Sequence, residues 1–268
     1  MLIEKIAKAF VTFLIVLTLS LLILIPVIVA IDAFSPTAYS NFPPSSLSLR
    51  WFQNFFGNPS LLSSLQISIL FAAIVAAATV TIGTLTSYVI ARYQFKGKNL
   101  IDALIQAPIV FPGVALGNAL LVFFYNSGFY YHPAMLIIGQ TIIGLPYVFR
   151  VMLPSFTGLN QSFEEASMTL GANRLQTFFR IILPLVKSGL LAGAILGFAA
   201  AFNDYAVSVF LVDPTIQTLP VQLMGLMQTG VDPTIAAAAT FTVIIMIVLL
   251  FACEKIVGID KLMTVVKY

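Results

Sequence analysis

The sequence predicts an all-α membrane protein with six transmembrane helices and both termini in the cytoplasm. Two observations predict this class. Of the 268 residues, 60% are hydrophobic and only 9% are charged, and the apolar residues gather in six long runs. A soluble domain carries roughly 25% charged residues, so this chain could not cover a folded surface in water. The runs also lack the apolar/polar alternation of transmembrane β-strands.

The first apolar run, residues 9–31, is predicted to be a retained transmembrane helix. A signal peptide would have a shorter apolar core, about 7–15 residues, that ends at a cleavage site with small residues. About 20 apolar residues are enough to cross a hydrocarbon core of ~30 Å. The run therefore meets the length of a span.

The following outer loop, residues 32–60, is rich in proline, serine and aromatic residues. Four aromatic residues near its end are expected on a short helix at the level of the lipid headgroups, where aromatic belts form: Trp51, Phe52, Phe55 and Phe56. Anchoring to the membrane is the favoured role, and contact with a substrate is the alternative.

Five more spans are predicted, near residues 62–91, 101–125, 134–156, 186–211 and 235–256. The first of these exceeds ~25 residues, so we expect it to tilt or to protrude into water. Pro108, Pro112 and Gly113 could break the span at 101–125, because proline interrupts helical hydrogen bonding.

Basic residues set the orientation, since cytoplasmic loops carry an excess of lysine and arginine. With the N-terminus inside, only Arg50 of the 13 basic residues falls outside. The single cysteine, Cys253, and the single histidine, His132, exclude an internal disulfide, a multi-cysteine metal site and a histidine cluster. No metal site is predicted, and nothing indicates nucleic-acid binding.

The most polar long stretch, EEASMTLGANRLQTFFRIILPL at residues 164–185, is placed in the cytoplasm between the fourth and fifth spans. Ser162 is predicted to cap a short helix, with Glu165 completing a capping box. Gly171 is expected to end that helix in the left-handed conformation. A second helix is predicted from an apolar ridge at helical spacing, formed by Leu175, Phe178, Phe179 and Ile182. Pro184 then suits the first turn of the fifth span.

This stretch resembles the EAA motif of ABC importer permeases, usually written EAA-x3-G-x9-I-x-LP. The matching residues, with the acid that precedes them, are Glu164, Glu165, Ala166, Ser167, Gly171, Ile181, Leu183 and Pro184. Ser167 stands where the family commonly has alanine, and we expect little consequence because both residues are small. In that family the segment forms coupling helices that dock on a cytoplasmic ATPase. An exposed Glu165 beside an apolar ridge would suit such a contact.

The resemblance implies a type-I importer (MetI-like) fold in the bacterial inner membrane. In this fold, residues 1–60 would be the first helix and the outer loop, and residues 61–256 would be the permease core, with coupling helices at 161–183. Residues 257–268 would be a cytoplasmic tail. It also implies a second permease subunit, two ATPase subunits and a periplasmic or lipid-anchored solute-binding protein. No cofactor is expected on this chain, because it lacks the pattern G-x-x-x-x-G-K-[ST] that cradles ATP, so ATP and Mg²⁺ belong to the partners.

A charge inside the membrane is expensive and is usually functional. Asp204, flanked by Asn203 and Tyr205, is the clear case in these spans. Gly189, Gly193 and Gly197 form a small-residue stripe that lets helices approach closely. We expect Asp204 to lie on the same side of the fifth span as this stripe and to line the substrate path. The alternative is an acid whose hydrogen bonds are satisfied at a subunit interface. Weaker path candidates are Asn118, Asn126 and Gln140.

The run from residue 202 to 240 resembles the C-type subunit of spermidine/putrescine-type permeases. The shared elements are Asn203-Asp204-Tyr205, Thr218-Leu219-Pro220 and the turn from Gly230 to Pro233. The resemblance implies import of a small cationic solute such as spermidine or putrescine and a B-type permease as the second subunit. Relatives in this branch are assigned to opines, phosphonates and other small compounds, which remain alternatives.

Two functions from other classes are less favoured by the sequence. A self-sufficient secondary transporter or channel would need internal repeats and midplane ion ligands, and no inverted repeat is visible. An intramembrane enzyme would need a catalytic pairing such as serine with histidine, and none stands at recognisable spacing. The sequence favours a transport subunit that is not itself an enzyme.

Overall fold

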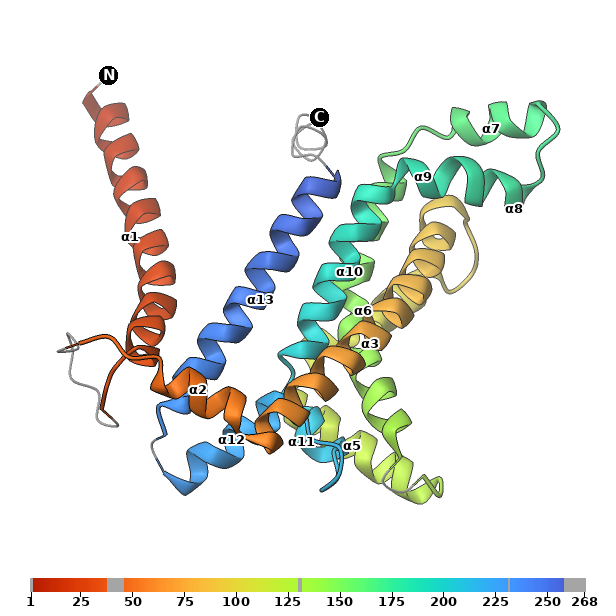
Figure 1. Ribbon diagram of the computed structural model, residues 1–268. Coiled ribbons are helices and arrows are strands. Elements are labelled where there is room, and N and C mark those ends of the chain that lie inside the picture. Colours follow the sequence, from red (N-terminus) through yellow and green to blue (C-terminus); the bar gives the residue numbers. More distant parts are fainter. Residues whose placement is uncertain (1, 38–45, 130–131, 231, 258–268) are drawn as a thin grey trace. The chain divides into compact units, whose positions relative to one another are not determined.

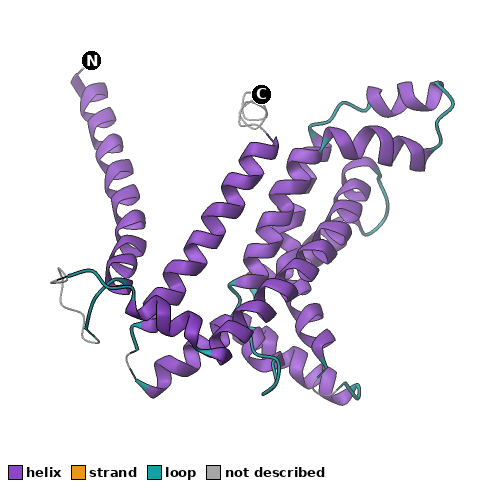
Figure 2. Cartoon of the chain, viewed as in Figure 1, coloured by secondary structure: helices purple, strands orange, loops and turns teal. Residues whose placement is uncertain are grey.

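The computed structural model of the chain describes residues 2–37, 46–129, 132–230 and 232–257. Within these ranges every regular element is a helix, which confirms the predicted all-α class (Figure 1, Figure 2). Nearly all of the predicted cytoplasmic tail, residues 258–268, lies outside the described residues, as does part of the outer loop, residues 38–45.

In chain order, the helices are α1 (Leu2–Ala33), α2 (Arg50–Gly57), α3 (Pro59–Arg92), α4 (Lys98–Val110), α5 (Gly113–Asn126), α6 (Pro133–Thr157), α7 (Ser162–Thr169), α8 (Arg174–Thr177), the π-helix η1 (Phe178–Ile182), α9 (Leu183–Leu185), α10 (Lys187–Phe202), α11 (Ser208–Leu211), α12 (Leu219–Thr229) and α13 (Thr234–Val257).

Four helices are long and apolar enough to span a membrane alone, and two bent pairs can each supply one more span. The four single spans are Ala7–Ala33, Pro59–Arg92, Pro133–Thr157 and Thr234–Lys255, which agree with the first, second, fourth and sixth predicted spans. At 34 residues, α3 is the long span whose tilt or protrusion the sequence predicts.

The third span is not one straight helix. α4 and α5 meet at an angle of 110° across Phe111 and Pro112. Pro112 has no N–H to continue the ladder, and it holds Phe111 before it in an extended conformation. Pro112 therefore lies at the break of this span, whereas Pro108 lies within α4.

By internal contacts the chain divides into two units, each described by itself. One comprises Met1–Leu62 with Leu223–Met246, and the other comprises Ser63–Gln222 with Ile247–Tyr268.

In the first unit, the aromatic helix α2 packs on protein. Trp51 and Phe55 are buried, and the Trp51 indole Nε1 donates to the backbone oxygen of Ser35 at 2.7 Å. The rings of Phe55 and Phe56 lie 5.9 and 5.0 Å from the ring of Phe241 in α13. The expected anchoring in the headgroups is therefore wrong for Trp51 and Phe55. The small residues that begin α13, such as Ala237, let these aromatic side chains approach.

In the second unit, the predicted stripe of small residues on α10 packs against α6 and α3. Gly189, Gly193 and Gly197 are all buried. A Cβ on Gly197 would lie 2.6 Å from the Thr79 Oγ1 and 3.2 Å from a methyl carbon of Val148. The backbones can approach this closely only without side chains, which confirms the stripe as a helix contact.

We predict that Gly197→Leu lowers the stability of the purified chain in detergent, because the new side chain overlaps Thr79 and Val148. Overpacking of this kind costs about 1–3 kcal/mol. Thermal unfolding followed by circular dichroism measures the loss. The matched control is Ala194→Leu on the same helix, because Ala194 lines an apolar cavity of about 480 Å³ with room for the larger side chain. Equal midpoints for the two variants would contradict the packing assigned to Gly197.

Candidate functional site: the polar segment at residues 162–185 and the break in the fifth span

The polar segment forms two helical parts joined by a tight turn, as its sequence predicts. α7 ends at Thr169, and Gly171 has a φ of +91°. The Gly171 N–H donates to the Met168 oxygen, and the Ala172 N–H donates to the Ser167 oxygen, which is a Schellman closure. Beyond the turn, α8, η1 and α9 form one helical run that meets α10 at an angle of 76°. We call residues 162–185 the coupling segment.

The predicted cap of α7 is wrong. Ser162 is already helical, the N-cap position falls on Gln161, and no side chain caps it. A capping box occurs instead at the start of α8. The Gln176 N–H donates to the Asn173 Oδ1 at 2.8 Å, and the Asn173 N–H donates to the Gln176 Oε1 at 3.0 Å. The spacing of Asn173 and Gln176 was a visible sequence signal for this cap.

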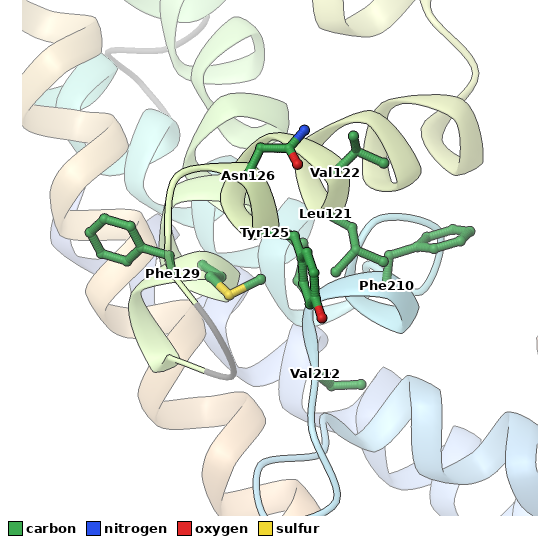
Figure 3. Close-up of a pocket in the computed structure, with 9 residues that line it drawn as sticks. Leu121, Val122, Tyr125, Asn126, Phe129, Phe210 and Val212 are labelled. Carbon is green, nitrogen blue, oxygen red and sulfur yellow. The ribbon is translucent and has the colours of Figure 1, made fainter.

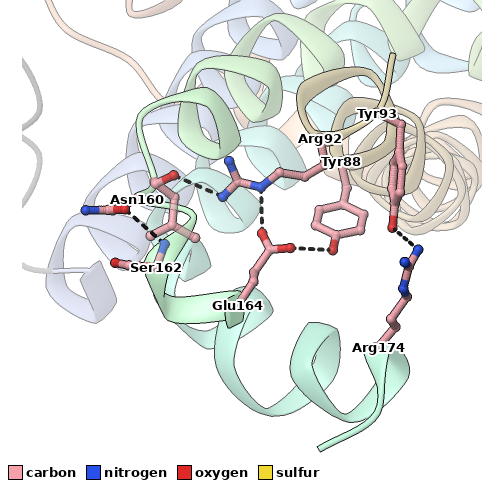
Figure 4. Close-up of polar contacts among 8 residues, drawn as sticks. Tyr88, Arg92, Tyr93, Asn160, Ser162, Glu164 and Arg174 are labelled. Carbon is pink, nitrogen blue, oxygen red and sulfur yellow. Dashed lines mark hydrogen bonds and ion pairs between the residues drawn. The ribbon is translucent and has the colours of Figure 1, made fainter. Parts of the chain in front are cut away.

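The two adjacent acids of the segment point to different surroundings. Glu165 is exposed, as expected for a docking contact. Glu164 is buried, so its side chain does not lie on the outer surface of the segment. Its Oε1 accepts from the Arg92 Nε at 2.5 Å, and its Oε2 accepts from the Tyr88 hydroxyl at 3.1 Å (Figure 4). Both partners belong to the last turns of α3.

Arg92 and Tyr88 are site residues that the sequence reasoning missed. They stand four positions apart, so they lie on one face of α3. The available signal was the length of α3, because a helix that outruns the membrane brings its last turns to the cytoplasmic segment.

The predicted apolar ridge divides into a buried and an exposed part. Phe178 and Ile182 are buried beside Val148, Met152 and Phe156 of α6. Leu175 and Phe179 are exposed, by 71% and 59%. The π-helical turn in η1 adds a residue to the helical repeat, so the four positions do not share one face.

The remaining motif residues hold the segment together or lie on its surface. The Ser167 and Thr177 hydroxyls are 3.0 Å apart, which links α7 to α8. The serine therefore makes a contact that an alanine could not make. Ala166 is exposed, Ile181 and Leu183 are half-buried, and Pro184 lies in α9 before the fifth span begins at Lys187.

The fifth span is interrupted where Asp204 lies. α10 ends at Phe202 and α11 begins at Ser208, so the continuous helix predicted over 186–211 is wrong, and so is the helical phase assigned to Asp204. The half-buried Asp204 carboxylate accepts from the backbone N–H groups of Val207 and Ser208, at 3.3 and 2.8 Å, and from the Ser208 hydroxyl at 2.7 Å. Aspartate at this place satisfies the free N–H groups of a new helix.

Gln140 is the one weaker candidate that the structure brings to this break through hydrogen bonds. It is buried on α6, and its Nε2 donates to the Ser208 hydroxyl at 3.0 Å and to the Ala201 oxygen at 3.2 Å. The Asp204, Ser208 and Gln140 side chains thus form one hydrogen-bonded chain from the fifth span to the fourth.

The other candidates lie elsewhere. Asn203 is exposed and donates back to the Ala199 oxygen, and Tyr205 is half-buried. Asn118 is exposed on α5. Asn126 lines a cavity of about 310 Å³ together with Tyr125, Phe129 and Phe210 (Figure 3).

Known proteins match the chain in sequence and in fold. Two relatives come from Escherichia coli (strain K12). Spermidine/putrescine transport system permease protein PotC is 28% identical over 207 residues, 77% of this chain and 78% of PotC. Putrescine transport system permease protein PotI is 32% identical over 200 residues, 72% of this chain and 71% of PotI.

Two solved structures, both 16% identical, share the fold. One is a bacterial ABC transporter involved in the import of the acidic polysaccharide alginate, with a TM-score of 0.71 over 94% of this chain and 96% of that one. The other is the inward-facing MetNI methionine ABC transporter, with a TM-score of 0.58 over 74% of this chain and 97% of that one. Residues 80–258 match the model of a family described as binding-protein-dependent transport system inner membrane component. The chain belongs to this family and is a multi-pass permease subunit of an ABC importer in the bacterial inner membrane.

Proposed function

We propose that the chain forms half of the translocation path of an ATP-driven importer for polyamines such as spermidine and putrescine. The observation that carries this proposal is the coupling segment, whose exposed face would receive work from an ATPase. The names of the relatives PotC and PotI supply the substrate class. Since one subunit encloses no path alone, a second permease of the B type would complete it.

The docking face would include Glu165 and exposed apolar side chains of the coupling segment. Leu170, Leu175 and Phe179 are exposed by 88%, 71% and 59%. A segment held in the cytoplasm gains by covering such apolar area with a partner protein. Two ATPase subunits that bind ATP and Mg²⁺ would dock here and close on each other, and the coupling segment would tilt with them. A periplasmic or lipid-anchored protein would deliver the substrate.

Charge supports a cationic substrate. Between Leu190 and Asp213 the sequence contains no lysine or arginine. The break in the fifth span therefore carries the negative charge of Asp204 with no basic residue nearby in the sequence. A half-buried carboxylate attracts an ammonium group more strongly than one in bulk water. A further relative, sulfate transport system permease protein CysT of Salmonella typhimurium, is 27% identical over 179 residues. Sulfate would be repelled by Asp204, so the charge favours the polyamine.

Asp204→Asn should raise the KM for spermidine uptake about tenfold, which corresponds to ~1.4 kcal/mol. Asparagine caps a helix nearly as well as aspartate, so the change removes charge and keeps the turn. The control Ser208→Ala weakens the same cap and leaves the charge in place. Uptake of labelled spermidine and sulfate into proteoliposomes with the whole transporter provides the test. A KM for spermidine that rises more in Ser208→Ala than in Asp204→Asn would count against a role for the charge.

Gly171→Ala should separate ATP hydrolysis from uptake, because alanine at a φ of +91° is strained by roughly 1–2 kcal/mol and displaces the turn of the coupling segment. Uptake should fall at least tenfold while the subunit stays in the membrane and ATP is still hydrolysed. Gly97→Ala is the matched control, since Gly97 has the same φ of +91° in the turn before α4. Loss of uptake in Gly97→Ala alone would contradict the role of the coupling segment.

A further inference from the structure

We infer that Glu164, Arg92 and Tyr88 form a joint that passes movement of the coupling segment to α3. The inference rests on the proposed function, because it names a second route by which the docking face drives the membrane helices. We call these three residues the α3–α7 joint.

The chain itself connects the coupling segment to two membrane helices only. A short linker, residues 158–161, leads back to α6, and the helical run through α9 leads on to α10. α3 lies earlier in the sequence, with 72 positions between Arg92 and Glu164. Movement of α7 can therefore reach α3 only through non-covalent contacts, and not along the chain.

The joint provides such a contact with defined geometry. The Arg92 guanidinium donates through Nε to Glu164 at 2.5 Å and through its terminal nitrogen to the Leu159 oxygen at 3.0 Å (Figure 4). The Tyr88 hydroxyl donates to the second Glu164 oxygen at 3.1 Å. Arg92 thus bonds to both α7 and the linker before it, and both carboxylate oxygens of Glu164 accept a hydrogen bond.

Burial makes this pair different from an ordinary surface ion pair. The side chains of Arg92 and Glu164 are only 10% and 12% exposed. Exposed ion pairs contribute little, whereas removing one partner of a buried pair leaves an uncompensated charge and is costly. The two charges consequently stay together when the segment moves.

Aromatic packing around Tyr88 restricts the movement of the α3–α7 joint. The Tyr88 ring lies 5.5 Å from the ring of Phe156 in α6 and 4.8 Å from the ring of Phe178 in η1. A second contact runs parallel to it, because the Arg174 guanidinium of α8 lies 3.4 Å from the hydroxyl of Tyr93, directly after α3. Both halves of the coupling segment therefore touch the cytoplasmic end of α3.

The two adjacent acids, Glu164 and Glu165, have different roles in this proposal. Glu165 is exposed and belongs to the docking face, while Glu164 faces inward to α3. Glu164 is thus a positioning residue, which acts through Arg92 and contacts neither the ATPase nor the substrate.

The test is a charge reversal in the complete transporter, reconstituted in proteoliposomes with its ATPase, second permease and binding protein. Arg92→Glu and Glu164→Arg should each place like charges together, lower spermidine uptake at least tenfold and raise the ATP consumed per molecule imported. The double variant should recover uptake to within about threefold. Lys96→Glu is the matched control, because Lys96 is exposed in the turn after α3, and its uptake should not change.

A second readout does not depend on transport. With Cys253 replaced by alanine, spin labels at the exposed positions Gln94 and Thr169 report the distance between the end of α3 and α7 by pulsed electron paramagnetic resonance. Each single reversal should broaden the distance distribution, and the double variant should narrow it again. Conservative Glu164→Gln serves the same comparison if a reversal prevents assembly.

Two results would overturn the joint. One is a spin-label distance distribution that stays narrow in both single variants. The other is a double variant whose fold-loss of spermidine uptake is as large as the product of the fold-losses in the two single variants. Failure of the proposed function is distinguishable, because a wild-type transporter that imports no spermidine would leave the spin-label comparison intact.

Discussion

Close contact between α6 and α10 is the constraint on which the coupling segment depends. These two helices are the ones that the segment joins along the chain, and glycines at 189, 193 and 197 let their backbones meet. A membrane gives no hydrophobic driving force between helices, so this contact relies on close packing. Its cytoplasmic continuation buries Phe178 and Ile182 of the segment against Met152 and Phe156. The base of the segment is thereby fixed before any partner binds.

In the described part of the unit that contains Ser63–Gln222, one buried charge is paired with an opposite charge and a half-buried one is not. At the cytoplasmic end of α3, the Arg92 and Glu164 charges neutralise each other and tie two helices together. In the break of the fifth span, the Asp204 charge has only neutral donors, namely the backbone and Ser208. A paired charge suits a mechanical link, while an unneutralised one suits attraction of a cation. Under the proposed function, the first site would serve coupling and the second would serve substrate recognition.

Sequence reasoning reached the features that local chemistry determines. The positive φ of Gly171, the small-residue stripe on α10 and the four uninterrupted spans follow from residue types and spacing alone. It failed where tertiary contacts decide. The inward side of Glu164 depends on Arg92, which is 72 positions away, and no spacing rule within the segment reveals it. Two local features also escaped it: the π-helical turn after Leu175, and the break before Ser208, where Asp204 accepts from the Ser208 N–H.

Under the proposed function, the outward face of the coupling segment contacts the ATPase. A photo-crosslinking amino acid at Leu175, which is exposed, tests this directly in the assembled transporter, with Thr177, which is buried, as the comparison position. We expect an adduct with the ATPase from position 175 and none from position 177. An assembled, ATP-hydrolysing particle that yields no adduct from position 175 would contradict it.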